Sequence, residues 1–212
     1  MTAQDEAALD VERLAGEAAD EPAALQGLLS AVGPERVAQP IREASAAALK
    51  LLATRRPELL MPRWDELAGL LDCDNAYSRM IAVHVLALLG PADNEGRLAA
   101  SLDRLYDHLS DMVSVAGHVL QVAPQVARAR PELRHRVTAR ILDLERLAKP
   151  DRLGLLRSYA IEALDGYLEP GERTPEIMAF VAAGVSDDSP KTRKLAAEVL
   201  ERWEPAPGAA RS

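Results

Sequence analysis

One recurring motif constrains the fold of this chain more than any other feature. A residue that is arginine in most copies is followed by a small residue three positions on and by leucine seven positions on. The copies are Arg42, Ser45 and Leu49; Arg79, Ala82 and Leu86; Val113, Ala116 and Leu120; Arg157, Ala160 and Leu164; and Arg193, Ala196 and Leu200. Offsets of three and seven fall near one face of a helix. Each copy therefore predicts an amphipathic helix with a small residue where another helix approaches closely.

An apolar segment with helical periodicity precedes each copy, so the repeating unit is predicted to be two helices joined by a short turn. We expect about five such pairs, over residues 20–56, 57–92, 93–130, 131–170 and 171–203. Proline suits the first turn of a helix, where its missing N–H needs no partner. Prolines stand at the expected helix starts, at Pro22, Pro40, Pro62, Pro131, Pro150, Pro175 and Pro190. Pro124 is expected to kink or stop a helix.

The two ends are predicted to differ from the repeats. Residues 1–19 are expected to form an N-terminal capping helix, with Leu9, Val11 and Leu14 facing inward. Residues 204–212 are expected to form a flexible tail. Residues 20–203 then make up a single repeat domain.

Composition agrees with an all-α fold and excludes several other classes. Aromatic residues are only 3% of the 212 residues, and no sustained alternation of apolar and polar residues predicts strands. The single cysteine, Cys73, excludes an internal disulfide framework and a cysteine-rich metal site. A formal charge of −8 argues against a protein that grips duplex nucleic acid through its phosphates. Without a secretory signal or a long apolar run, we expect a cytoplasmic protein that does not enter membranes.

The helix pairs resemble HEAT repeats, most closely in the fifth pair, IMAFVAAGVSDDSPKTRKLAAEVLERW. The resemblance covers roughly residues 20–203 and implies a right-handed alpha-solenoid, a superhelix of about five antiparallel pairs with a concave face. In that family an aspartate in the turn and an arginine six residues on can form a ladder between neighbouring pairs. Asp151 with Arg157 and Asp187 with Arg193 keep that spacing, while the first and third pairs depart from it. The resemblance predicts architecture, and function has to be argued separately.

Residues that carry catalysis or bind metals form no strong constellation in the sequence. His84 and His118 share one position in the repeat, and a surface pair is favoured over a metal site, which would need a third ligand. Cys73 lies in a turn and has no nearby histidine in the sequence to activate it. We therefore expect no catalytic residue, no cofactor and no metal, and a protein that is not an enzyme.

Offsets of one, five and eight from the start of each motif face away from the apolar stripe and predict an exposed ridge on each second helix. The residues of the predicted partner-binding ridge are Met80, His84, Ser114, His118, Gln121, Ser158, Glu162, Asp165, Glu198 and Glu201. Its later members are mostly acidic, which favours a basic or amphipathic helical peptide as partner. Solvated ridges without a binding role are the alternative.

The favoured function is a non-catalytic scaffold or adaptor that binds a protein or peptide on the concave face of a solenoid. The alternative is a HEAT-like DNA glycosylase acting on alkylated bases, which the acidic balance and the lack of an aromatic, basic groove disfavour. A HEAT-like factor that attaches bilins is a third possibility, but no attachment motif supports it.

Overall fold

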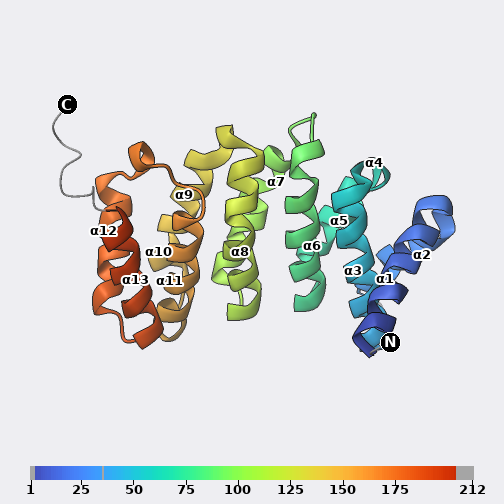
Figure 1. Ribbon diagram of the computed structural model, residues 1–212, viewed down its shortest axis with the longest axis horizontal. Coiled ribbons are helices and arrows are strands. Elements are labelled where there is room, and N and C mark those ends of the chain that lie inside the picture. The colour runs from blue at the N-terminus through green and yellow to red at the C-terminus, as the bar shows by residue number, and fades with distance from the viewer. Residues whose placement is uncertain (1–2, 35, 204–212) are drawn as a thin grey trace. The chain divides into compact units, whose positions relative to one another are not determined.

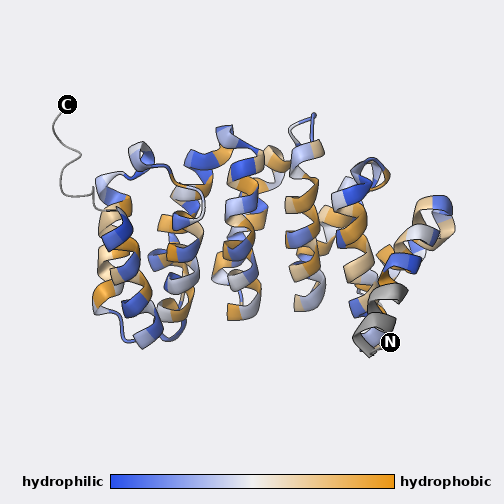
Figure 2. Ribbon diagram, viewed as in Figure 1, coloured by the Kyte–Doolittle hydropathy of each residue, from blue (hydrophilic) through white to orange (hydrophobic). Residues whose placement is uncertain are grey.

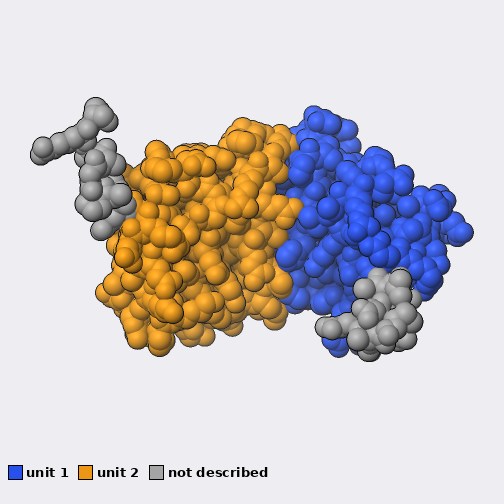
Figure 3. Space-filling model, in the orientation of Figure 1, with its two compact units in different colours: residues 1–105 blue, residues 106–212 orange. Residues whose placement is uncertain are grey.

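The structure is a computed structural model that describes residues 3–34 and 36–203, with side chains from residue 11 onward. These residues lie in helices and the turns between them and include no strand, which confirms the all-α prediction. The chain divides into two compact units, residues 1–105 and 106–212, which we call the N-terminal and C-terminal units (Figure 3). The predicted tail over residues 204–212 lies outside the described residues. None of the described helices has the length and apolar character that a membrane span requires.

In the N-terminal unit the third helix is the centre of the packing, because it contacts the first, second and sixth helices (Figure 1). The elements are α1 (Ala3–Asp20), α2 (Pro22–Val32), α3 (Gln39–Arg55), α4 (Pro57–Leu60), η1 (Met61–Arg63), α5 (Trp64–Gly69), η2 (Leu70–Asp72), α6 (Ala76–Leu89), η3 (Gly90–Ala92) and α7 (Arg97–Asp107). The last residues of α7 belong to the C-terminal unit.

In the C-terminal unit the eleventh helix lies between the eighth and the thirteenth and packs on both (Figure 1). The elements are η4 (His108–Ser110), α8 (Val113–Ala129), η5 (Pro131–Leu133), α9 (Arg134–Leu142), α10 (Leu144–Leu147), α11 (Pro150–Asp165), η6 (Pro170–Glu172), α12 (Pro175–Ala183), η7 (Gly184–Ser186) and α13 (Pro190–Trp203).

The recurring motif lies on α3, α6, α8, α11 and α13, and its second and third residues lie on the inward-facing stripe of each helix, as predicted. Its small residue is buried in every copy, and its leucine is fully buried in all copies but the last. Apolar residues recur along these helices among polar ones (Figure 2). Leu200 of α13 is only half-buried, since no further helix in the described chain follows α13 to cover it.

The prolines begin helical segments, as predicted. Pro22, Pro150, Pro175 and Pro190 are the first residues of α2, α11, α12 and α13. Pro40 is the second residue of α3, and the remaining two lie within the first two residues of η1 and η5. Because these positions need no intrahelical N–H bond, proline marks the starts without weakening the helices.

Pro124 does not stop its helix, contrary to one expectation from the sequence, because α8 continues through it to Ala129. The ring packs against Gly166, the residue just after α11, where an added Cβ would come within 3.1 Å of the proline Cγ. Packing of α8 against α9 and α11 thus outweighs the hydrogen bond that proline removes.

The predicted N-terminal helix is present as α1, which contacts α2 and α3. Val11 and Leu14 are half-buried, and the side chain of Leu9 lies outside the described residues. Ala15 and Ala18 are buried instead, so small residues rather than the larger ones form the close contact of this helix.

Replacing Tyr106 with phenylalanine is expected to raise the free energy of unfolding by about 1 kcal/mol. The Tyr106 side chain is completely buried, and its hydroxyl has no hydrogen-bond partner within the described chain. Burial raises the pKa of this phenol well above its ordinary value, and the nearby Tyr167 adds to the shift. The substitution removes an unsatisfied polar atom without changing the shape of the ring. Urea unfolding of the full chain measures the change.

Tyr167→Phe is the matched control, because the Tyr167 hydroxyl lies 2.7 Å from the Thr138 hydroxyl in a buried hydrogen bond. Its removal is expected to lower the free energy of unfolding by about 1 kcal/mol. A loss of stability in the Tyr106 variant would contradict the prediction.

Candidate functional site

The second helices of the C-terminal unit carry most of the predicted partner-binding residues. On α8, Ser114 and Gln121 are exposed and His118 is half-buried. On α13, Glu198 and Glu201 are exposed. We call the exposed or half-buried members of this set the C-terminal ridge, consisting of Ser114, His118, Gln121, Glu162, Asp165, Glu198 and Glu201.

Ser158 of α11 does not belong to an exposed ridge, which corrects the expectation from the sequence. Its side chain is completely buried and its hydroxyl donates to the Leu155 carbonyl at 2.7 Å. One turn earlier, the Gly154 carbonyl accepts a hydrogen bond from the Thr192 hydroxyl of α13 at 2.7 Å. This flank of α11 is therefore covered by α13. Beyond its first two residues, the exposed residues of α11 lie further round the helix, at Leu155 and Glu162.

Two of the predicted acidic residues have cationic neighbours. Asp165 is half-buried and accepts from Arg202 at 2.7 Å and from the Trp203 indole N–H at 2.8 Å. Glu198 lies 3.8 Å from the Lys194 ammonium. Asp165 thus joins α11 to the end of α13, and the surface is less acidic than the ridge residues alone predict.

A shallow groove of about 210 Å³ lies between α8 and α11 and brings two predicted ridge residues together. Gln121 comes from α8 and Glu162 from α11, and Tyr159 lines the groove beside them. The Tyr159 ring lies against Gly117, where an added Cβ would be 3.4 Å from the ring, and the Lys191 ammonium of α13 lies 5.1 Å from the ring centroid. The Glu162 carboxylate makes no ion pair within the described residues. The groove therefore offers an aromatic surface next to an unpaired carboxylate.

Tyr159 was not among the residues predicted from the sequence. Its offset of two from Arg157 is neither in the apolar stripe nor in the predicted ridge. The signal that could have found it is Gly117 on α8, because a glycine inside a helix allows an aromatic ring of the next helix to approach closely.

The other two predicted ridge residues belong to the N-terminal unit. Met80 and His84 are half-buried on α6, and His84 takes part in a polar or ring interaction there. They are less exposed than Ser114 and Gln121 of α8 and than the ridge residues of α13.

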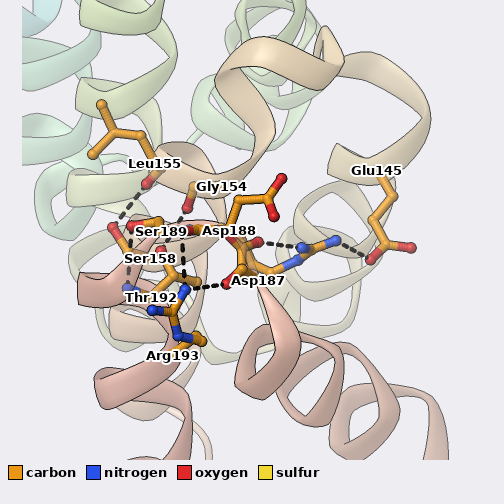
Figure 4. A network of polar contacts seen from close by, with 10 residues as sticks. Glu145, Gly154, Leu155, Ser158, Asp187, Asp188, Ser189, Thr192 and Arg193 are labelled. Atoms are coloured by element: carbon orange, nitrogen blue, oxygen red, sulfur yellow. Dashed lines mark hydrogen bonds and ion pairs between the residues drawn. The ribbon is translucent and has the colours of Figure 1, made fainter.

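The four residues of the implied ladder lie in the C-terminal unit and make different contacts. Figure 4 shows two of them, Asp187 and Arg193. Arg157 of α11 donates to the Asp187 carboxylate at 2.5 Å and to Glu145 at 2.7 Å. Asp187 follows η7, so this ion pair joins the fourth predicted helix pair to the fifth. The Asp151 carboxylate is exposed and lies 3.9 Å from Arg152. The Arg157–Asp187 pair is largely buried, with 11% and 4% of the two side chains exposed.

Arg193 contacts backbone atoms instead of a carboxylate. Its guanidinium donates to the carbonyls of Asp187 and Asp188, at 2.7 and 2.9 Å. Arg79 of α6 donates in the same way to the carbonyls of Cys73 and Asp74, at 2.5 and 3.0 Å. In both cases the arginine bonds the residues six and five positions before it. The repeated spacing thus places each arginine where it can hold the turn against the helix that follows it.

The described side chains include no group of three or more histidine, cysteine, aspartate or glutamate residues placed to hold a metal ion. Cys73 is a half-buried free thiol in the turn before α6. Comparison with protein-family models and with curated proteins finds no match.

Proposed function

We propose that this chain is a non-catalytic binding protein, a HEAT-like alpha-solenoid that docks a basic amphipathic helical peptide. Two features support a solenoid: the motif recurs on successive second helices, and α11 packs on both α8 and α13 in the C-terminal unit. Proteins built in this way bind partners through the surfaces that their repeated helices share. The peptide is placed on the C-terminal ridge, within one compact unit.

The groove between α8 and α11 is the observation that carries this proposal. Apolar side chains of an amphipathic helix would pack against Tyr159 and Pro124, which are half-buried and line the groove with Glu162. Lysine or arginine on the same peptide would lie near Glu162 and Glu201, whose carboxylates are exposed and form no ion pair within the described chain. An acidic peptide would instead place like charges together, which opposes binding.

The test uses two fluorescent, designed helical peptides with the same apolar face, one carrying lysine and the other glutamate on its polar face. We expect the lysine peptide to bind the full chain more tightly in fluorescence anisotropy titrations. The double variant Glu162→Lys and Glu201→Lys is expected to weaken that binding about tenfold, since each reversal turns an attraction into a repulsion.

The matched control is Glu132→Lys with Asp188→Lys, which makes the same change in net charge on η5 and in the turn before α13 of the same unit. These residues are also exposed and lie outside the ridge. The control is expected to bind the lysine peptide like the unaltered chain. Equal loss in both variants, equal binding of the two peptides, or binding of a DNA duplex at low salt in place of peptide would overturn the proposal.

A further inference from the structure

A second concave site lies in the C-terminal unit, away from the second helices. It is a cavity of about 450 Å³ formed by α9, α12, η6 and the residues just after α11. Its apolar lining includes Ala139, Leu142, Leu168 and Ile177. A volume of this size falls in the range of cavities that bind small organic molecules.

Three charged side chains line the same cavity. The Arg134 guanidinium lies 3.3 Å from both carboxylate oxygens of Glu172, and one of those oxygens accepts the Glu169 N–H at 2.9 Å. Glu176 stands in the first turn of α12. Two carboxylates and one guanidinium leave an excess of one negative charge around an apolar interior.

Both carboxylates are held in the ionised form. The hydrogen bond from the Glu169 backbone lowers the pKa of Glu172, and Arg134 adds to the effect. A hydrogen bond from Thr174 lowers the pKa of Glu176. Three other polar residues line the cavity: Thr138 is engaged with the Tyr167 hydroxyl at 2.7 Å, the Thr174 hydroxyl accepts the Ile177 N–H at 3.5 Å, and His135 is exposed on α9. The carboxylates are therefore the groups that select a ligand by charge.

We propose that this cavity binds a small apolar amine, with the hydrocarbon or aromatic part against Leu142, Leu168 and Ile177 and the ammonium at Glu172 and Glu176. A cation there is attracted by two carboxylates and repelled by one guanidinium. An anion is repelled by the two carboxylates and attracted by one guanidinium. The apolar part supplies affinity by leaving water, and the charged end sets the orientation.

This site is separate from the proposed peptide surface. It is formed mainly by α9 and α12, whereas the C-terminal ridge lies on α8, α11 and α13. Loss of amine binding therefore leaves the peptide proposal standing, and failure of the peptide proposal leaves this one standing.

The probes are three indole compounds that differ in charge: tryptamine, its neutral alcohol analogue tryptophol, and indole-3-acetate. Isothermal titration calorimetry with the full chain is expected to rank tryptamine first, with about a tenfold preference over indole-3-acetate. Glu172→Gln and Glu176→Gln are each expected to weaken tryptamine about threefold and to leave tryptophol unchanged. Glutamine keeps the size of the side chain and an acceptor for the Glu169 N–H.

Ala139→Trp is expected to fill the cavity and reduce the affinity for tryptamine and tryptophol more than tenfold. Ala139 is exposed on α9, so the larger side chain can be accommodated without repacking the core. Ala179→Trp is the control, because Ala179 is exposed on α12 but does not line the cavity. Equal affinity for the three compounds, no heat with any of them, or unchanged binding in Ala139→Trp would overturn the proposal.

Discussion

Replacing Asp187 with alanine is expected to lower the free energy of unfolding by about 3 kcal/mol. The substitution leaves the Arg157 guanidinium, of which only 11% is exposed, without its buried partner. It also removes the acceptor of the Ser189 N–H, which lies 2.9 Å from the Asp187 carboxylate. Breaking a buried ion pair costs more stability than the intact pair contributes, because the remaining charge keeps its desolvation penalty without the attraction that offset it. Urea unfolding of the full chain measures the loss.

Glu145→Ala is the matched control, because Glu145 is the other carboxylate bonded to Arg157 and is 49% exposed. Water screens that contact, so its loss is expected to be below about 1 kcal/mol. Adding Arg157→Met to the Asp187 variant separates the contribution of the ion pair from that of the Ser189 hydrogen bond. If the two charges are coupled, the double variant should lose less free energy of unfolding than the sum of the losses in the two single variants. Strict additivity would contradict a coupled pair.

Leu164→Ala is expected to lower the free energy of unfolding by about 3 kcal/mol. Leu164 is the leucine of the motif on α11 and is completely buried in a helix that packs on both α8 and α13. Alanine would remove its buried apolar surface and leave a cavity that helices held on both sides cannot close.

The equivalent leucine of α13, Leu200, gives the comparison within the same unit. It is half-buried, and Leu200→Ala is expected to cost about 1 kcal/mol. Urea unfolding measures both variants. Equal losses of free energy of unfolding at the two positions would contradict the prediction that the motif leucine contributes more in an inner helix than in the last one.

The elements of the fold were predictable because their signals are local. The motif on α11, with Ala160 and Leu164, is a buried stripe because helical periodicity places those offsets on one face. Prolines such as Pro175 begin helices because backbone chemistry allows them there. The expectation that Pro124 could end its helix was wrong, because the effect of this proline depends on the space that Gly166 leaves on a neighbouring segment. That kind of packing is not visible in a local pattern.

The candidate site was less predictable for the same reason. Periodicity places Ser158 away from the apolar stripe of α11. Its side chain is nevertheless buried, because α13 covers that flank and the periodicity of one helix does not show where its neighbour lies. Sequence spacing also could not assign Arg157 to Asp187, thirty residues away, or Asp165 to Trp203. Which groups meet depends on how the helices pack, whereas the spacing only shows which groups could lie on one face.

The contacts of Arg79 and Arg193 have a consequence for how such a chain can diversify. Each arginine bonds two main-chain carbonyls of the preceding turn, at Cys73 and Asp74 or at Asp187 and Asp188. A main-chain carbonyl is present whatever the side chain. In the first of these turns, Cys73 and Asp74 can therefore be replaced by other residues without loss of the hydrogen bonds from Arg79. In the second, Asp187 is bound by its own ion pair and only Asp188 is free to vary. Substitutions should therefore accumulate at Cys73, Asp74 and Asp188, while Arg79, Arg193 and Asp187 stay fixed.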